Sequence, residues 1–344
     1  MAVSRNSSAV FPVGAPFNTA TPASGNFIPS VWSAKLNAKF YASTVFGEIA
    51  NTNWQGEISG MGDKVIINTA PTITVTNYTV GGGGLNYQVP QADVQEMLID
   101  KAKAFAFQIN DVLDFQAKPN LLDMFSADAG EQMKIAIDST VLFNTVTSTT
   151  NGPAAANMGA TAGAKSGAYS MGIAGTPIAI NATAGDAANV LTKILQLSSI
   201  LDEQNVPESD RFLLIDPATR VLLMNTNLAQ AQFMGDSQSI VRNGKIGMID
   251  RFTVYVTNQL PYAAANATVW TSADGSETSG TITTNAAKRR VIVAGHKTGL
   301  TFASQITKME TIRNPNDFGD YIRSLNVFGY RTVKPEALAL CIVS

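Results

Sequence analysis

Alternating apolar and polar residues in the first third of the chain predict an extended β arm. In Thr72–Tyr78, β-branched apolar residues alternate with threonines and an asparagine, which is the period of a strand with one polar face. A β-rich run, Lys64–Thr69, precedes it, and Gly81–Gly84 interrupts the pattern before an extended stretch resumes beyond Pro90. We therefore expect residues 55–108 to form a long hairpin-like arm with a flexible interior.

Shorter apolar runs further along the chain predict the strands of a folded body. Phe212–Ile215 is a continuous apolar run with the length of a buried strand, and Phe252–Val256 contains an alternating pattern. Similar signals recur towards the C-terminus, at residues 290–294, 300–303, 321–330 and 339–343.

Residues 119–147 show the spacing of three and four that is typical of an amphipathic helix. Asn120 is suited to cap this helix, and Asp123 lies in the first turn, where a negative charge is favourable. We expect this helix to be the spine of a domain. The residues expected to pack along its apolar stripe are Leu122, Phe125, Met133, Ala136 and Phe143.

Three shorter helices are also predicted. Trp32, Leu36 and Phe40 fall four residues apart, which places them on one face of a helix over residues 30–41. Helical periodicity returns at residues 190–201. Asp216 followed by Pro217 combines an N-cap with proline at the first helical position, and this predicts a further helix start.

The order of these elements predicts an α+β fold. Helices and strands do not alternate as they do in a doubly wound sheet, and no repeat of 20–50 residues is visible. Residues 147–185 and 262–288 are rich in Ala, Thr, Gly and Ser, and we expect both to be loops, with a small β excursion as the alternative for the first.

The predicted arm is not expected to be stable without support. A two-stranded ribbon is marginally stable in water, because nothing covers its apolar face. About 15 residues of strand reach about 50 Å, so the arm needs support from its own body or from a neighbouring molecule. Residues 1–28, which several prolines interrupt, are expected to form a second extended arm.

Composition excludes several classes of function. The 24 basic and 26 acidic residues give a net charge of −2, whereas a protein that wraps nucleic acid electrostatically should be basic. If the chain faces DNA, we expect it to enclose the DNA without sequence-specific binding. A lone cysteine, Cys341, cannot form an intramolecular disulfide, and we expect it to be a small buried residue. We also expect no secretory signal and no membrane span.

Candidate catalytic chemistry is sparse. The chain has one histidine, His296, so a metal site built from several His and Cys ligands cannot form. Residues 159–166 superficially resemble a phosphate-binding loop, but the spacing of their glycines and lysine is wrong. We expect no cofactor, no metal and no enzymatic activity. A hydrolase that uses His296 with an unrecognised nucleophile is the alternative.

Several stretches in this order resemble the major capsid proteins of tailed phages with the Hong Kong 97-type fold. They are the runs at residues 28–36, 62–67, 71–75, 128–138 and 321–338. The resemblance covers roughly residues 28–344 and implies an N-terminal arm, an extended E-loop, a peripheral P-domain with a spine helix, and an axial A-domain. The implied limits are 1–28 for the arm, 29–52 for the start of the P-domain, 53–108 for the E-loop, 109–147 for the P-domain with its spine helix, 148–300 for the A-domain, and 301–344 for the C-terminal P-domain strands.

The resemblance also implies a function and partners. Such subunits form hexamers and pentamers in an icosahedral shell around double-stranded DNA, with a portal protein at one vertex. The expected location is the virion, after assembly in the host cytoplasm. We expect the E-loop and the N-terminal arm to make the contacts between subunits. The candidate contact residues are Ile73, Val75, Tyr78, Gly81, Gly84, Leu85, Tyr87, Phe11 and Phe17.

The chain departs from some relatives at two places. No lysine occurs from Val65 to Asp100, so a covalent cross-link from an E-loop lysine is not expected, and non-covalent contacts or a decoration protein would reinforce the shell. Residues 1–28 are too short and too rich in proline to be a helical scaffolding segment, which implies a separate scaffolding protein. Another phage structural subunit, such as a tail-tube or decoration protein, is the alternative interpretation.

Overall fold

The computed structural model describes most of the chain outside the N-terminal segment. The described residues are 41–42, 44–53, 64–69, 71, 73–77, 80, 87–91, 93–111, 121–163, 165, 168–226, 247–279, 287–315 and 317–344. The predicted helix at residues 30–41 and the N-terminal arm at residues 1–28 therefore lie outside the described residues, apart from Tyr41. No helix among the described residues is long and apolar enough to span a membrane.

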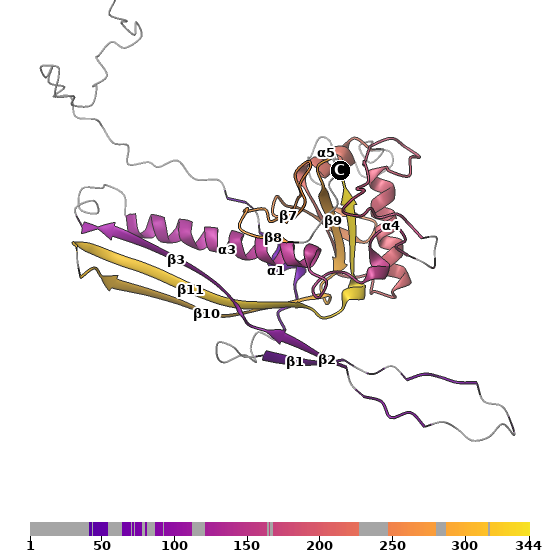
Figure 1. Ribbon diagram of the computed structural model, residues 1–344, viewed down its shortest axis with the longest axis horizontal. Coiled ribbons are helices and arrows are strands. Elements are labelled where there is room, and N and C mark those ends of the chain that lie inside the picture. The colour runs from indigo at the N-terminus through magenta and orange to yellow at the C-terminus, as the bar shows by residue number, and fades with distance from the viewer. Residues whose placement is uncertain are drawn as a thin grey trace, which may run out of the picture.

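A long helix lying along a three-stranded antiparallel sheet forms one part of the molecule (Figure 1). The helix is α3 (Leu121–Thr147), and the strand order is β10 (Leu300–Arg313), β11 (Gly319–Thr332), β3 (Lys101–Asn110). Strand β3 alternates between half-buried aromatic and exposed small residues, so one of its faces turns towards the helix. Phe107 of that face meets Phe125 of α3 edge-on, with ring centroids 6.0 Å apart.

The spine helix predicted at residues 119–147 is confirmed, but its two ends lie in different surroundings. Phe143 is 2% exposed, and every residue from 137 to 143 is buried. Met133 packs against the same core and Ala136 is half-buried. Leu122 and Phe125 stay about 40% exposed, and among the described residues the first turns of α3 are covered by the three-stranded sheet and contacted by Tyr41, whose hydroxyl donates to Asp128. The predicted stripe is therefore fully covered only in the second half of the helix.

A five-stranded mixed sheet forms the other part of the body, with α4 (Val190–Glu203) and α5 (Pro217–Met224) beside it (Figure 1). All neighbouring strands run antiparallel except β4 and β6, which are parallel. The strand order is β12 (Leu338–Val343), β9 (Arg290–His296), β4 (Arg211–Ile215), β6 (Phe252–Val256), β5 (Met248–Ile249).

The central strand β4 explains how this sheet is held. All five of its residues are buried, and its side chains alternate between two cores. Phe212 and Leu214 belong to the core shared with α3, and Leu213 and Ile215 belong to the core under α4. An apolar run without polar alternation is what a strand covered on both faces requires. The strand predicted at residues 212–215 is therefore confirmed.

The two shorter helices of the body begin where the sequence predicts. The Asn189 side chain accepts a hydrogen bond from the Leu191 N–H group at the start of α4. The Asp216 side chain accepts one from the Thr219 N–H group, with Pro217 in the first turn of α5. Each cap satisfies an amide that has no partner within its helix.

Strand pairing differs from the predicted division of the chain at three places. Strand β3 was assigned mostly to the arm, which was expected to end at residue 108, but it pairs with β11 along its whole length. Strand β12 was grouped with the strands after residue 300, but it pairs with β9 in the five-stranded sheet. The segment 262–288, predicted to be a loop, contains the short hairpin β7 (Trp270–Thr271) and β8 (Thr278–Ser279).

The arm begins from its own two-stranded stem. Strands β1 (Lys64–Thr69) and β2 (Asp93–Leu98) pair antiparallel, and their inner side chains form a small core with β10 and β11. The strand predicted at Thr72–Tyr78 is wrong for the described residues 73–77, which form no ladder. A further short helix, α1 (Phe46–Ile49), and the 3₁₀ turns η2 (Ala155–Asn157) and η4 (Pro335–Ala337) complete the described helices.

Candidate inter-subunit surfaces

The arm presents apolar side chains that its own subunit leaves in water. Ile73, Val75, Tyr87 and Val89 are 63%, 94%, 90% and 85% exposed. Isolated apolar residues are common on protein surfaces, but four such residues on one narrow projection are not expected in a stable monomer. Figure 1 shows this projection pointing away from both sheets. These four side chains are called the apolar arm face below.

The two limbs of the arm are linked by the side-chain amide of Gln88, which bonds to the backbone of Thr74. The Thr74 N–H group donates to Gln88 Oε1 at 3.0 Å, and Gln88 Nε2 donates to the Thr74 carbonyl at 2.9 Å. The Gln88 side chain therefore lies between the two limbs. Since side chains alternate along an extended chain, Ile73 and Val75 project from one side of their limb, and Tyr87 and Val89 from one side of theirs.

The stem of the arm, unlike the part beyond it, buries apolar side chains against its own subunit. Val65, Ile67 and Met97 are buried against the body, while Ile66 and Leu98 remain about half exposed on the outer side. On that outer side the Lys64 ammonium lies 2.9 Å from a Glu96 carboxylate oxygen. The stem is therefore fixed to its own subunit, and only the part beyond it lacks a cover.

A second uncovered surface lies on the three-stranded sheet, on the face opposite to α3. Ala104 and Ala106 of β3 are small and exposed, and they lie beside the larger Leu325 and Tyr321 of β11. Together they line two adjoining hollows of about 510 and 390 Å³. This surface is called the outer sheet face below.

One ion pair crosses the outer sheet face. Arg323 of β11 donates from Nε to Glu310 of β10 at 2.9 Å, and the two residues are direct cross-strand partners. Arg323 also borders both hollows. The surface therefore combines apolar walls with one fixed pair of charges, a combination typical of the border of a protein contact.

Some of the predicted contact residues are exposed in the structure, whereas the outer sheet face was not predicted from the sequence. Ile73, Val75 and Tyr87 are exposed, as a contact role requires, and that role stays a prediction. A signal for the missed surface existed, since alanines alternate with lysine and phenylalanine in Lys101–Phe107. The other candidates lie outside the described residues: Tyr78, Gly81, Gly84, Leu85, Phe11 and Phe17.

The residues considered for catalysis have structural contacts. His296 Nδ1 lies 2.8 Å from Thr298 Oγ1 and accepts the Thr298 N–H group at 3.2 Å, and burial lowers the pKa of the ring. Burial raises the pKa of the Cys341 thiol to about 12, so the reactive thiolate is disfavoured. Among the described residues, no cluster of three or more His, Cys, Asp or Glu side chains could hold a metal ion. The hydrolase hypothesis gains no support from these contacts.

The architecture defines a class of protein: a spine helix on a three-stranded sheet, a separate mixed sheet and a projecting arm form the Hong Kong 97-type fold of phage capsids. A chain from Mycobacterium phage Che8 matches with a TM-score of 0.66 and 22% identity, covering 93% of this chain and 98% of that one. A capsid chain of the cyanophage P-SCSP1u matches with a TM-score of 0.64 and 16% identity, covering 96% and 97%. One from the capsid of Ralstonia phage GP4 matches with 0.61 and 10%, covering 95% and 98%.

The protein belongs to the phage capsid protein family, whose profile matches residues 91–341. None of the curated proteins matches it. Its function is that of a major capsid protein, a subunit of the shell and thus a component of the virion. This finding favours the capsid interpretation over a tail-tube or decoration protein.

Proposed function

We propose that copies of this chain assemble as hexamers and pentamers into an icosahedral shell around double-stranded DNA, and that the arm holds neighbouring copies together. The observation that carries this proposal is the apolar arm face, four apolar side chains that are at least 63% exposed on a projection without a core. Assembly would take place in the host cytoplasm. The domain limits implied by the capsid resemblance are part of this proposal, except that β3 and β12 are grouped with the sheets in which they pair and the arm is the segment between β1 and β2.

The outer sheet face of a neighbouring copy is the surface that we propose to receive the arm. The arm offers a row of β-branched and aromatic side chains, and the outer sheet face offers hollows between alanines and larger residues. Burying one such apolar side chain contributes about 1.5–3 kcal/mol. Because each subunit both offers an arm and receives one, modest contacts combine into a strong lattice.

Non-covalent attachment is the proposed means of holding the shell. No lysine occurs from Val65 to Asp100, so this part of the chain offers no side-chain amine for an isopeptide bond. The N-terminal segment would add contacts through Phe11 and Phe17. We further propose a portal protein, a separate scaffolding protein and a decoration protein as partners, and no enzymatic role for the subunit.

Deletion of the arm tests this function. Removing residues 72–90 should leave a folded subunit, because the arm contributes no side chain to the three described cores. The deleted chain should fail to form stable shells in electron micrographs. Normal particles from it would refute the role proposed for the arm.

A matched pair of single substitutions separates the apolar arm face from the arm as a whole. Val75→Asp places a charge on that face, and Thr76→Asp places the same charge on the opposite face of the same limb. We expect shells from Thr76→Asp and few or none from Val75→Asp, with equal circular dichroism spectra of the two subunits. Equal shell yields from both variants would contradict a directional apolar contact.

A further inference from the structure

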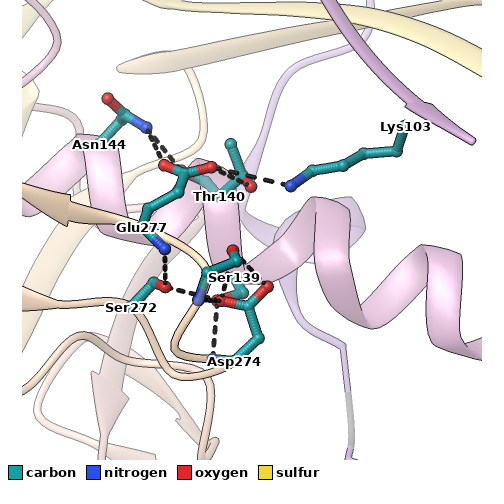
Figure 2. A network of polar contacts seen from close by, with 8 residues as sticks. Lys103, Ser139, Thr140, Asn144, Ser272, Asp274 and Glu277 are labelled. Atoms are coloured by element: carbon teal, nitrogen blue, oxygen red, sulfur yellow. Dashed lines mark hydrogen bonds and ion pairs between the residues drawn. The ribbon is translucent and has the colours of Figure 1, made fainter.

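The hairpin β7–β8 is attached to the spine helix by a network of polar side chains (Figure 2). This network is called the polar clasp, and its members come from three elements far apart in sequence. They are Ser139, Thr140 and Asn144 on α3, Ser272, Asp274 and Glu277 on the hairpin, and Lys103 on β3.

Glu277 forms one half of the polar clasp. Thr140 Oγ1 donates to Glu277 Oε1 at 2.7 Å, and Asn144 Nδ2 donates to Glu277 Oε2 at 3.3 Å. The Lys103 ammonium lies 3.8 Å from Glu277 Oε1. Figure 2 shows the carboxylate between Asn144 and Thr140, with Lys103 approaching on the side of Thr140. One carboxylate of the hairpin therefore contacts both the spine helix and the strand that leads out of the arm.

Asp274 forms the other half. Its Oδ1 accepts hydrogen bonds from Ser139 Oγ at 3.2 Å and from Ser272 Oγ at 2.6 Å. Burial acts to raise the pKa of Asp274, but hydrogen bonds from Ser272, Ser276 and Ser139 outweigh burial and lower it. The carboxylate is therefore ionised at neutral pH, the state in which hydrogen bonds to it are strongest. The following residue, Gly275, has φ +72°, which favours glycine at this turn.

The helix side of the polar clasp is buried, which gives its hydrogen bonds a role in selecting one arrangement. Ser139 and Thr140 are 0% and 3% exposed, and the neighbouring Val141 is a buried core residue. A buried hydroxyl that loses its partner is costly, so only one placement of the hairpin along the helix satisfies both. The preceding residue, Asp138, accepts the Val45 and Phe46 N–H groups on behalf of α1. One turn of the helix thus fixes two distant segments.

We propose that the polar clasp is a lock that fixes the hairpin β7–β8 at one position on the spine helix. The five-stranded sheet is fixed with it, because the bridges Tyr262–Thr271 and Ala263–Arg289 connect β7 to the residue that precedes β9. Apolar contacts alone are non-directional and would tolerate small shifts between the two parts of the body. The hydrogen bonds to Asp274 and Glu277 are directional and would be broken by such shifts. The consequence for shell geometry, a uniform particle curvature, rests on the proposed assembly function. The lock itself is a property of the single subunit.

Hydrogen exchange of the isolated subunit tests the lock without reference to shells. Thr140→Val removes one hydroxyl at nearly constant volume, and Glu277→Gln removes the charge. We expect amide exchange in residues 271–279 to become about tenfold faster in each variant, as the loss of a hydrogen bond to a charged group implies. Thr140→Ser, which keeps the hydroxyl, should exchange as slowly as the unsubstituted protein. Thr278→Ala, an exposed neighbour on β8, is the matched control and should not change it.

The two readouts separate failure of the lock from failure of the assembly function. Unchanged exchange in both Thr140→Val and Glu277→Gln would overturn the lock, whatever their shells look like. Faster exchange together with a broadened distribution of particle diameters in cryo-electron micrographs is the expected result. Faster exchange with particles as uniform as the unsubstituted protein would overturn the proposed control of curvature. If one of the two variants fails to fold, the other is measured alone against Thr278→Ala, and unchanged exchange in that variant would overturn the lock. If both fold, additive effects of Thr140→Val and Glu277→Gln in a double-mutant cycle would also overturn it.

Discussion

The arm and the five-stranded sheet contain the same kinds of apolar residue, but the sheet buries them and the arm exposes them to water. Leu213 and Leu214 of β4 are completely buried, whereas Val75 and Tyr87 of the arm are 94% and 90% exposed. In the sheet, apolar side chains stabilise the subunit itself. In the arm they add nothing to the three described cores, as the proposed contact with a neighbouring copy requires. Substitutions in the two regions should therefore separate folding from assembly.

The largest effect on the subunit is expected at the centre of the sheet. Leu214→Ala removes a fully buried side chain from the core shared with α3. We expect the free energy of unfolding to fall by about 2–5 kcal/mol, through lost transfer energy and the cavity left behind. Urea unfolding followed by circular dichroism measures this. A loss below about 0.5 kcal/mol would mean that burial in β4 does not stabilise the body as the comparison requires.

Asp138 should make the stability of the body depend on pH. Burial raises its pKa from 3.8 to about 6, although two backbone N–H groups act to lower it. Because the folded pKa is the higher one, its contribution to stability is present below pH 4 and is lost as pH rises through 6, by on the order of 2–3 kcal/mol. Asp138→Asn is neutral at every pH and should lose this dependence. Parallel curves for the two proteins between pH 4 and 7, from chemical denaturation, would disprove it.

The exposed ion pair Lys64–Glu96 on the arm stem should contribute much less to stability than the buried Asp138. Lys64 and Glu96 are each about half exposed, so water screens the attraction between them. We expect Lys64→Ala to reduce the free energy of unfolding by only about 0.5 kcal/mol. This loss should not change further when salt is added above about 0.15 M, because the attraction is already screened. Thermal unfolding at two salt concentrations is the measurement. A loss of several kcal/mol would show that the stem is held differently.

The smallest effect on the subunit is expected on the apolar arm face itself. The double substitution Val75→Ala, Tyr87→Ala should change the free energy of unfolding by less than about 0.5 kcal/mol, since neither side chain is buried. The same change should lower the temperature at which assembled shells dissociate. Calorimetry of subunits and of shells compares the two directly. Destabilised subunits with unaffected shells would reverse the proposed division of roles.

Local patterns were sufficient to predict most individual elements. The helix at residues 119–147 was recognised from its spacing and α5 from Asp216 with Pro217, because these signals act within a few residues of one another. The buried strand β4 was recognised from its uninterrupted apolar run. The short hairpin at residues 270–279 was missed, since its strands are only two residues long and carry no usable periodicity.

For the candidate site, the sequence indicated an arm without a core, and the exposure of Ile73, Val75 and Tyr87 agrees with that expectation. The outer sheet face and the polar clasp were not predicted. Each is assembled from segments more than 130 residues apart, such as Ser139 with Asp274 or Ala106 with Arg323. No local period connects such residues.

What the sequence by itself determined is therefore the kind of most elements and the lack of a core within the arm, because periodicity and polarity depend on neighbouring residues. What only the tertiary structure decided is the partner of each element. The pairing of β3 with β11 rather than with the arm, and of β12 with β9, depends on hydrogen bonds between distant segments that many other strands could have formed. Which pairing prevails depends on the burial achieved by the whole fold, a sum that no single segment contains.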